Sequence, residues 1–181
     1  PFPGYQNSLM LQFEDGWVDA SIRLPGDSGF THDAAIADVD GDGDIDIFVL
    51  NNGTPPDRNK KYWLINDGEA NFEFNDELLP ESYPRNGSNG RWAVWAADVA
   101  DLNEDGYPDM IFGGTSEAGN VSRIYWGTGS GFSDDSLTEL TLTDVIETLG
   151  TDRLEVTNVD SVDINNDGRL DLWISGQGNF Y

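Results

Sequence analysis

The feature that most constrains this chain is a nine-residue acidic motif that occurs three times at nearly even spacing. Each copy reads Asp-x-Asp/Asn-x-Asp-Gly-x-x-Asp, and the copies begin at residues 38, 101 and 163, so their starts lie 63 and then 62 residues apart. A period of that length predicts an array of similar structural units. The three copies are Asp38–Asp46, Asp101–Asp109 and Asp163–Asp171.

Each acidic motif lies between two mostly apolar runs that predict strands, since β-branched and aromatic residues follow it directly. A second element alternates with the first and consists of an apolar run, a Gly-containing turn and a short aromatic run, which is typical of a β-hairpin. Its copies begin near Leu9, Tyr62 and Ile124. Apart from one helical turn predicted around Leu142–Leu149, we expect an all-β chain.

The alternation of the two elements divides the chain into a single array of three units without a domain boundary. Each unit is a plain hairpin followed by an acidic-loop hairpin, over residues of approximately 9–53, 62–114 and 124–176. Segments 51–60 and 80–90 are polar and rich in Pro, Gly and Asn, so they are expected to be surface connections. A fourth plain hairpin would begin at Phe180.

The residue types of the acidic motif predict a calcium site. Asp or Asn at positions 1, 3 and 5 supplies three side-chain oxygens, Gly at position 6 permits a sharp bend, the carbonyl of position 7 points inward, and Asp at position 9 adds a carboxylate. Oxygen ligands in this number suit Ca²⁺ better than the stricter octahedron of Mg²⁺. Without a cation the carboxylates repel one another. A solvated acidic turn would explain one copy, but not three copies with Gly and Asp at fixed offsets.

An EF-hand begins with the same pattern, but it requires a bidentate Glu at position 12 and flanking helices. Position 12 is apolar in all three copies, where Val49, Phe112 and Ile174 stand. The acidic motif therefore joins strands and does not form an EF-hand.

The three motifs resemble the calcium loops of FG-GAP/VCBS repeats, which are known from integrin alpha-chain heads and many secreted bacterial proteins, and Phe112-Gly113-Gly114 resembles the Phe-Gly element of that family. The resemblance implies that each repeat is one four-stranded blade of a β-propeller and that each loop binds Ca²⁺ on one rim, about three ions in all. It also implies the following metal ligands by position: Asp38, Asp40, Asp42, Asp44 (carbonyl) and Asp46; Asp101, Asn103, Asp105, Tyr107 (carbonyl) and Asp109; and Asp163, Asn165, Asp167, Arg169 (carbonyl) and Asp171.

The number of repeats is too small for a closed ring, because propellers close with about four to eight blades. We expect an incomplete or open propeller. Either the chain is part of a longer propeller, or protein partners or copies of itself cover the open blade edges. Head-to-tail contacts between copies that do not close would produce a filament.

The charge of the chain limits its partners. With 34 acidic and 9 basic residues the net charge is −25, which disfavours binding to nucleic acid. The absence of a run of 18 apolar residues predicts no membrane insertion. Extracellular calcium modules bind weakly, at about 10⁻⁴–10⁻³ M. We therefore expect an extracellular, secreted or cell-surface protein with a structural, adhesive or self-assembling role and no catalysis of its own.

Three other features bear on function. His32 is the only His and is expected to be a hydrogen-bonded loop residue beside Asp33 rather than a proton carrier. Asp98 and Asp160 each precede an acidic loop by three residues and are expected to support it rather than to add a ligand. Matches to the N-glycosylation pattern at predicted loops are about as frequent as chance; they are Asn52, Asn86 and Asn120.

The alternative function is a carbohydrate-binding or polysaccharide-processing propeller of which this chain is a portion. Trp92 and Trp95 lie in a Gly- and Asn-rich stretch that could stack on extracellular glycans. The simplest interpretation of the tryptophans in strand-like runs is packing between blades; they are Trp63, Trp126 and Trp173.

Overall fold

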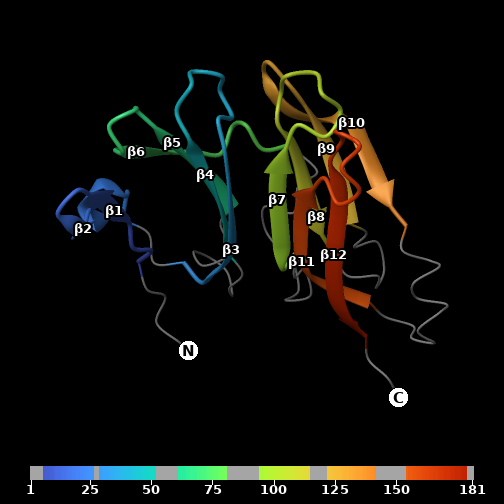
Figure 1. Cartoon of the computed structure of the whole chain (residues 1–181), viewed down its shortest axis with the longest axis horizontal. Helices are drawn as coiled ribbons and strands as arrows, with labels where there is room; N and C mark the ends of the chain where they lie inside the picture. The colour runs from blue at the N-terminus through green and yellow to red at the C-terminus, as the bar shows by residue number, and fades with distance from the viewer. Residues whose placement is uncertain are drawn as a thin grey trace.

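The computed structural model describes residues 6–26, 29–51, 61–80, 94–114, 122–141 and 154–178 (Figure 1). Apart from one 3₁₀ turn, η1 (Ser21–Arg23), the regular structure in these residues is β, which confirms the predicted class. The strands are β1 (Met10–Phe13), β2 (Gly16–Asp19), β3 (Thr31–Ala37), β4 (Asp46–Asn51), β5 (Lys61–Asn66), β6 (Phe72–Asn75), β7 (Ala96–Ala100), β8 (Asp109–Gly113), β9 (Ser122–Thr128), β10 (Gly131–Leu140), β11 (Leu154–Val162) and β12 (Asp171–Gly178).

The strands form four antiparallel sheets in which sequence neighbours pair. Two sheets have four strands, β3-β4-β5-β6 (blade 1) and β7-β8-β9-β10 (blade 2). The other two are single hairpins, β1-β2 and β11-β12. None of these sheets closes into a barrel, and they stand face to face in a row, as the blades of an incomplete propeller do (Figure 1).

The sheets and the units drawn from the sequence are out of phase. The sequence units 9–53, 62–114 and 124–176 begin with the plain hairpin, whereas each four-stranded sheet begins with the acidic-loop hairpin and ends with the plain one. Hairpin β1-β2 therefore does not join β3 and β4. The physical reason is that a repeat period gives the spacing of the units but not the residue at which a unit begins. A unit that begins with the plain hairpin and one that begins with the acidic-loop hairpin would bury the same apolar runs. The described chain holds two complete blades with half a blade at each end.

Both faces of the middle strands are buried, which explains their nearly continuous apolar sequences. In β4, Phe48 and Leu50 face a cluster shared with blade 2, whereas Val49 faces a cluster shared with Leu24, beside η1. A third cluster joins blade 2 to β11-β12 through Ile111 and Val156. Packing between blades thus forms the core of the molecule.

Aspartates on the first strand of each blade reach across to the neighbouring blade. Asp33 on β3 accepts a hydrogen bond from the backbone N–H of Ala97 on β7 (3.0 Å). Asp98 on β7 accepts hydrogen bonds from the N–H (2.6 Å) and hydroxyl (2.5 Å) of Ser161 on β11. The prediction that Asp98 supports its own loop was therefore wrong, because its carboxylate connects two blades. Asp160 accepts a hydrogen bond from the side chain of Asn158 and likewise does not support its loop.

The tryptophans have different environments. Trp63 is fully buried between blades 1 and 2, and Trp126 is partly buried against β11-β12, as predicted. Trp173 is 59 % exposed, so the expectation that it packs between blades was wrong for this chain: the face of β12 that carries it has no neighbouring blade in the described residues. The predicted helical turn at Leu142–Leu149, Trp92 and the three glycosylation matches lie outside the described residues.

His32 lies in β3 rather than in a loop. It occupies a bulge in the pairing with β4 and packs edge-on against Trp95, with ring centroids 4.2 Å apart. Burial lowers the pKa of His32, although the carboxylates of Asp33 and Glu155 act in the opposite direction. Because His32 precedes the acidic loop by almost the whole strand, it has no role at that loop.

Candidate metal centre

The three acidic motifs form the connections between the first two strands of three of the four sheets, β3–β4, β7–β8 and β11–β12. They lie along the same side of the row of sheets, the upper side in Figure 1. The local sequence builds these loops with little help from the rest of the molecule, because most of their hydrogen bonds join side chains and backbone groups within nine residues.

The backbone at positions 4 and 6 adopts the left-handed conformation in every copy. Gly at position 6 has φ of 96°, 91° and 92° in Gly43, Gly106 and Gly168. Position 4, which the sequence pattern leaves open, has φ of 79°, 61° and 59° in Gly41, Glu104 and Asn166. Non-glycine residues rarely adopt this conformation. The loop is thus bent twice, and sequence reasoning found only the second bend.

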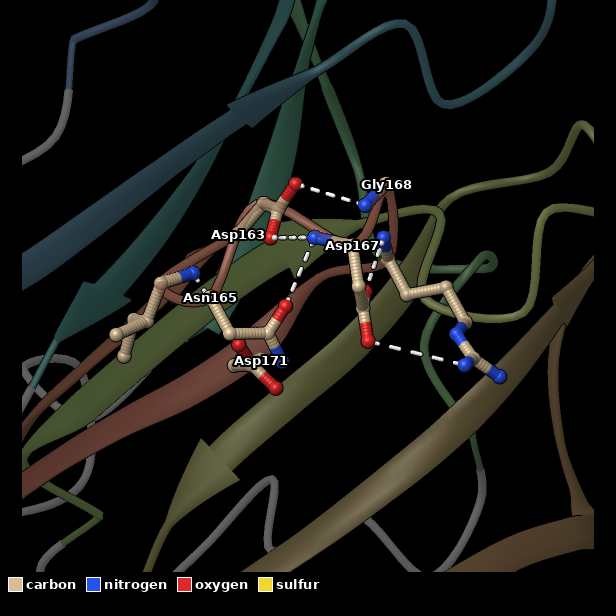
Figure 2. Close-up of polar contacts among 7 residues, drawn as sticks. Asp163, Asn165, Asp167, Gly168 and Asp171 are labelled. Atoms are coloured by element: carbon tan, nitrogen blue, oxygen red, sulfur yellow. Dashed lines mark hydrogen bonds and ion pairs between the residues drawn. The ribbon is translucent and has the colours of Figure 1, made fainter.

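Side chains at positions 1, 3 and 5 turn inward and accept hydrogen bonds from the loop backbone, as Figure 2 shows for the third copy. The carboxylate of position 1 accepts the N–H of position 6 at 2.9 Å in all three loops: Gly43 to Asp38, Gly106 to Asp101 and Gly168 to Asp163. Position 3 accepts the N–H of position 5: Asp42 to Asp40 (3.2 Å), Asp105 to Asn103 (2.9 Å) and Asp167 to Asn165 (2.8 Å). Position 5 accepts the N–H of position 7: Asp44 to Asp42 (2.9 Å), Tyr107 to Asp105 (2.9 Å) and Arg169 to Asp167 (3.0 Å).

This arrangement gathers oxygen atoms in one place. In the first loop, one carboxylate oxygen from each of Asp38, Asp40 and Asp42 lies within 4.8 Å of the others. Asn replaces the middle Asp in the second and third loops, so there two carboxylates and an amide oxygen take the three positions. A hard divalent cation that accepts several oxygen ligands, such as Ca²⁺, fits this donor set.

Position 7 has an additional structural role. The side chain of Asp44 lies against Gly68 in the β5–β6 turn, and that of Tyr107 lies against Gly129 in the β9–β10 turn. A Cβ at Gly68 would stand 2.5 Å from the Asp44 carboxylate, and one at Gly129 would stand 3.2 Å from the Tyr107 ring. The first and second loops therefore each rest on the turn of the plain hairpin in their own blade. Carbonyl coordination by Asp44, Tyr107 and Arg169 stays a prediction.

The Asp at position 9 connects the loop to the sheet. Asp46 and Asp109 are fully buried, and each accepts one N–H from position 2 of its own loop, Val39 or Leu102, at 2.9 Å. Their other oxygens accept an N–H from the third strand of the blade: Asn66 to Asp46 and Gly127 to Asp109, each at 2.8 Å. Burial raises the pKa of Asp46 and of Asp109, although these hydrogen bonds oppose the shift. Sequence reasoning placed both residues in the motif but missed this bridging role.

The third loop lacks part of this support. Asp171 accepts the N–H of Ile164 at 3.1 Å, but in the described residues no third strand donates to its second oxygen. The guanidinium of Arg169 instead lies 3.7 Å from Asp167, one of the inward-facing carboxylates (Figure 2). Within the part of the chain that the structure describes, the third loop therefore keeps its internal hydrogen bonds and receives none from a third strand.

Comparison with protein families identifies the repeat. The FG-GAP-like repeat matches twice, over residues 38–112 and 101–174, so the matches cover most of the chain and include all three acidic loops. The chain belongs to the FG-GAP-like repeat family. No curated protein gives a significant match to it. With the family shown, the row of antiparallel sheets is a β-propeller repeat array, as the sequence predicted.

Proposed function

We propose that this FG-GAP repeat chain is an extracellular calcium-binding module whose role is structural or adhesive, with one Ca²⁺ in each acidic loop. The observation that carries the proposal is the recurrence of one loop geometry in three copies. In each of them the same three hydrogen bonds hold the side-chain oxygens of positions 1, 3 and 5 together. Independent acidic turns have no reason to keep the same bonds.

The proposed ion stabilises the blades because each loop joins the first two strands of a sheet. Carboxylates gathered in the loop repel one another, and a divalent cation removes that repulsion. Metal affinity then contributes directly to folding free energy. The side chain of position 7 rests on the plain hairpin in both complete blades, so an ordered loop also orders the outer half of the blade.

Localisation and role follow from the family and from the expected affinity. FG-GAP repeats are commonly extracellular and typically non-catalytic. Sites of this kind are filled at extracellular calcium concentrations, where modules with dissociation constants of about 10⁻⁴–10⁻³ M operate. Among the described residues, no helix is long and apolar enough to cross a membrane.

Differential scanning calorimetry in 1 mM Ca²⁺ and in excess EGTA tests the proposal. Three sites with a dissociation constant of about 10⁻⁴ M would each add about 1.4 kcal/mol at that concentration. For a chain of this size the sum corresponds to a fall in Tm of about 10 °C in EGTA. Addition of 1 mM Mg²⁺ in place of Ca²⁺ is the matched control and should restore little of the loss. An unchanged Tm in EGTA would refute the calcium assignment.

A further inference from the structure

We propose that the calcium site of the third acidic loop is positioned from the neighbouring sheet. Asp98 of β7 holds Ser161 of β11, two residues before that loop, and thereby sets the calcium affinity of the third loop. The second loop, which is closer to Asp98 in the sequence, does not depend on this contact. The inference rests on the proposed calcium binding and assigns a positioning residue to one of the sites.

Three hydrogen bonds fix the carboxylate of Asp98. Its Oδ1 accepts the backbone N–H of Val99 at 2.9 Å, which orients the carboxylate on its own strand. Its Oδ2 accepts both the N–H (2.6 Å) and the hydroxyl (2.5 Å) of Ser161. Hydrogen bonds to a carboxylate are shorter and stronger than those between neutral groups. This contact therefore ties β11 firmly to β7, and the two strands lie side by side (Figure 1).

Ser161 lies at the end of the hairpin that carries the third loop. It pairs with Leu172, and the next pair, Val162 with Asp171, is the last one before the loop. The first ligand position of the loop follows Val162 directly, and Asp171 is position 9, so the placement of both depends on these last two pairs. Strand ends open more readily than strand centres. Asp98 opposes that opening at the point where it would separate the ligands.

Apolar packing surrounds the same contact. Leu102, at position 2 of the second loop, packs against the cluster that joins blade 2 to β11-β12. Val159 belongs to that cluster, and Leu172, the strand partner of Ser161, packs against it. The N–H of Leu102 is in turn held by the buried Asp109 at 2.9 Å. Blade 2 thus presents a fixed surface on which the loop end of β11-β12 rests.

The fixed partner in this contact is β7, whose position does not require an ion in the second loop. Strand β7 pairs with β8 along its whole length, from Ala96 to Ala100. Ala97 and Val99, on either side of Asp98, are buried in the core between blades 1 and 2. Asp98 therefore acts on the third loop through the strand and independently of calcium in its own blade.

The junction between blades 1 and 2 uses the same device at a different level of the strands. Asp33 accepts the N–H of the next residue, Ala34, at 2.9 Å and the N–H of Ala97 on the next sheet at 3.0 Å. Ala97, however, lies three pairs from the pair that closes the second loop, whereas Ser161 lies one pair from the closing pair of the third. We therefore expect the effect on calcium affinity to be larger at the third loop.

Calcium titration of ¹⁵N-labelled protein, followed by nuclear magnetic resonance, measures each loop separately. The reporters are the position-6 amides, which donate to the position-1 carboxylates: Gly43, Gly106 and Gly168. Asp98→Ala should weaken calcium binding at Gly168 about five- to tenfold, because apparent affinity falls with the fraction of molecules in the binding-competent arrangement. Binding at Gly106 should change by less than about twofold. Ser161→Ala loses the hydroxyl but keeps the N–H, so its loss at Gly168 should be smaller.

Two further variants separate position from charge. Asp160→Ala removes the same charge three residues before the third loop, as Asp98 stands before the second, and Asp160 bonds to Asn158 of its own strand. Because exposed charges are screened by salt, Asp160→Ala should leave affinity at Gly168 within about twofold of wild type. Asp98→Asn removes the charge but keeps an oxygen that can accept from Ser161, so it should restore most of the affinity that Asp98→Ala loses.

The outcomes distinguish this inference from the calcium proposal on which it rests. Equal affinity at Gly168 in wild type and Asp98→Ala would overturn the positioning role alone. So would an equal loss at Gly106, or an Asp98→Asn variant as weak as Asp98→Ala, since both would indicate a general electrostatic effect. A wild type in which none of the three glycine resonances responds to Ca²⁺ would overturn both proposals. If Asp98→Ala fails to fold by far-UV circular dichroism, unchanged affinity at Gly168 in Ser161→Ala would overturn the positioning role.

Discussion

The second and third acidic loops have the same internal structure and different surroundings. In both, positions 1, 3 and 5 accept the same backbone N–H groups within 0.1 Å of the same distances. Asp109 is buried and also bonded to Gly127 of β9, whereas no described strand donates to the second oxygen of Asp171. The difference shows that the shape of the loop is encoded within nine residues, while its connection to the blade depends on a strand further along the chain.

The strongest test of this comparison is the same substitution at both position-9 residues. Asp109→Ala would leave the part-buried N–H group of Leu102 and the buried N–H group of Gly127 without an acceptor, and we expect a loss of about 3 kcal/mol of unfolding free energy. Asp171→Ala removes a single, more exposed hydrogen bond, so the loss should stay within about 1 kcal/mol. Urea unfolding of both variants in EGTA measures the difference without a contribution from calcium. Equal losses would contradict the bridging role of Asp109.

The comparison between copies extends to the start of the third strand in blades 1 and 2, where Lys61 and Ser122 are equivalent and both are buried. Burial lowers the pKa of Lys61 to about 8. An unfolded Lys titrates near 10.4, so between these values the unfolded chain holds a proton that the folded chain has lost. Stability should therefore rise by about 1–2 kcal/mol between pH 7.5 and 9.5.

Urea midpoints of the wild type and of Lys61→Met across that pH range measure this effect. The variant keeps the aliphatic bulk and should show a flat profile over the same window. Ser122→Ala is the matched variant in blade 2, where the rise should persist because Lys61 is retained. A rise of the same size in Lys61→Met would assign the pH dependence to another group.

The sequence alone predicted the features of this molecule that depend on residues close together in the chain. The bend at Gly106, the inward positions of Asp101 and Asp105 and the flanking strands follow from short-range pattern and turn chemistry. The bend at Glu104 was missed because Glu carries no signal for a left-handed backbone. The phase of the blades was also missed, since a period does not say which hairpin begins the sheet.

The rest depends on contacts between distant segments. Nothing in the sequence around Trp173 distinguishes it from Phe48 or Ile111, which are buried at the same position. The exposure of Trp173 is a property of what lies beside β12, not of the strand itself. The same holds for Asp98, whose carboxylate reaches Ser161 on another sheet, and for Asp109, whose second partner comes from β9.

The smallest expected effect on calcium affinity concerns Arg169, whose positively charged side chain lies at the third loop. The exposed guanidinium of Arg169 is 3.7 Å from Asp167, and the equivalent residues in the other loops are Asp44 and Tyr107. Exposed pairs of this kind contribute up to about 1 kcal/mol, so Arg169→Gln should tighten calcium binding at the third site by about two- to five-fold. Isothermal titration calorimetry of this variant beside Arg123→Gln, which changes a distant Arg, measures the shift. Weaker binding in Arg169→Gln would show that the guanidinium supports the site.

Calcium binding by the acidic loops is best tested through the calcium stoichiometry of the wild type and of Asp105→Ala, measured by isothermal titration calorimetry. Asp105 provides the position-5 carboxylate of the second loop and faces the backbone of Tyr107. We expect three bound ions for the wild type and two for Asp105→Ala, with the first and third sites unaltered. A wild type that binds no calcium, or a variant that still binds three ions, would contradict it.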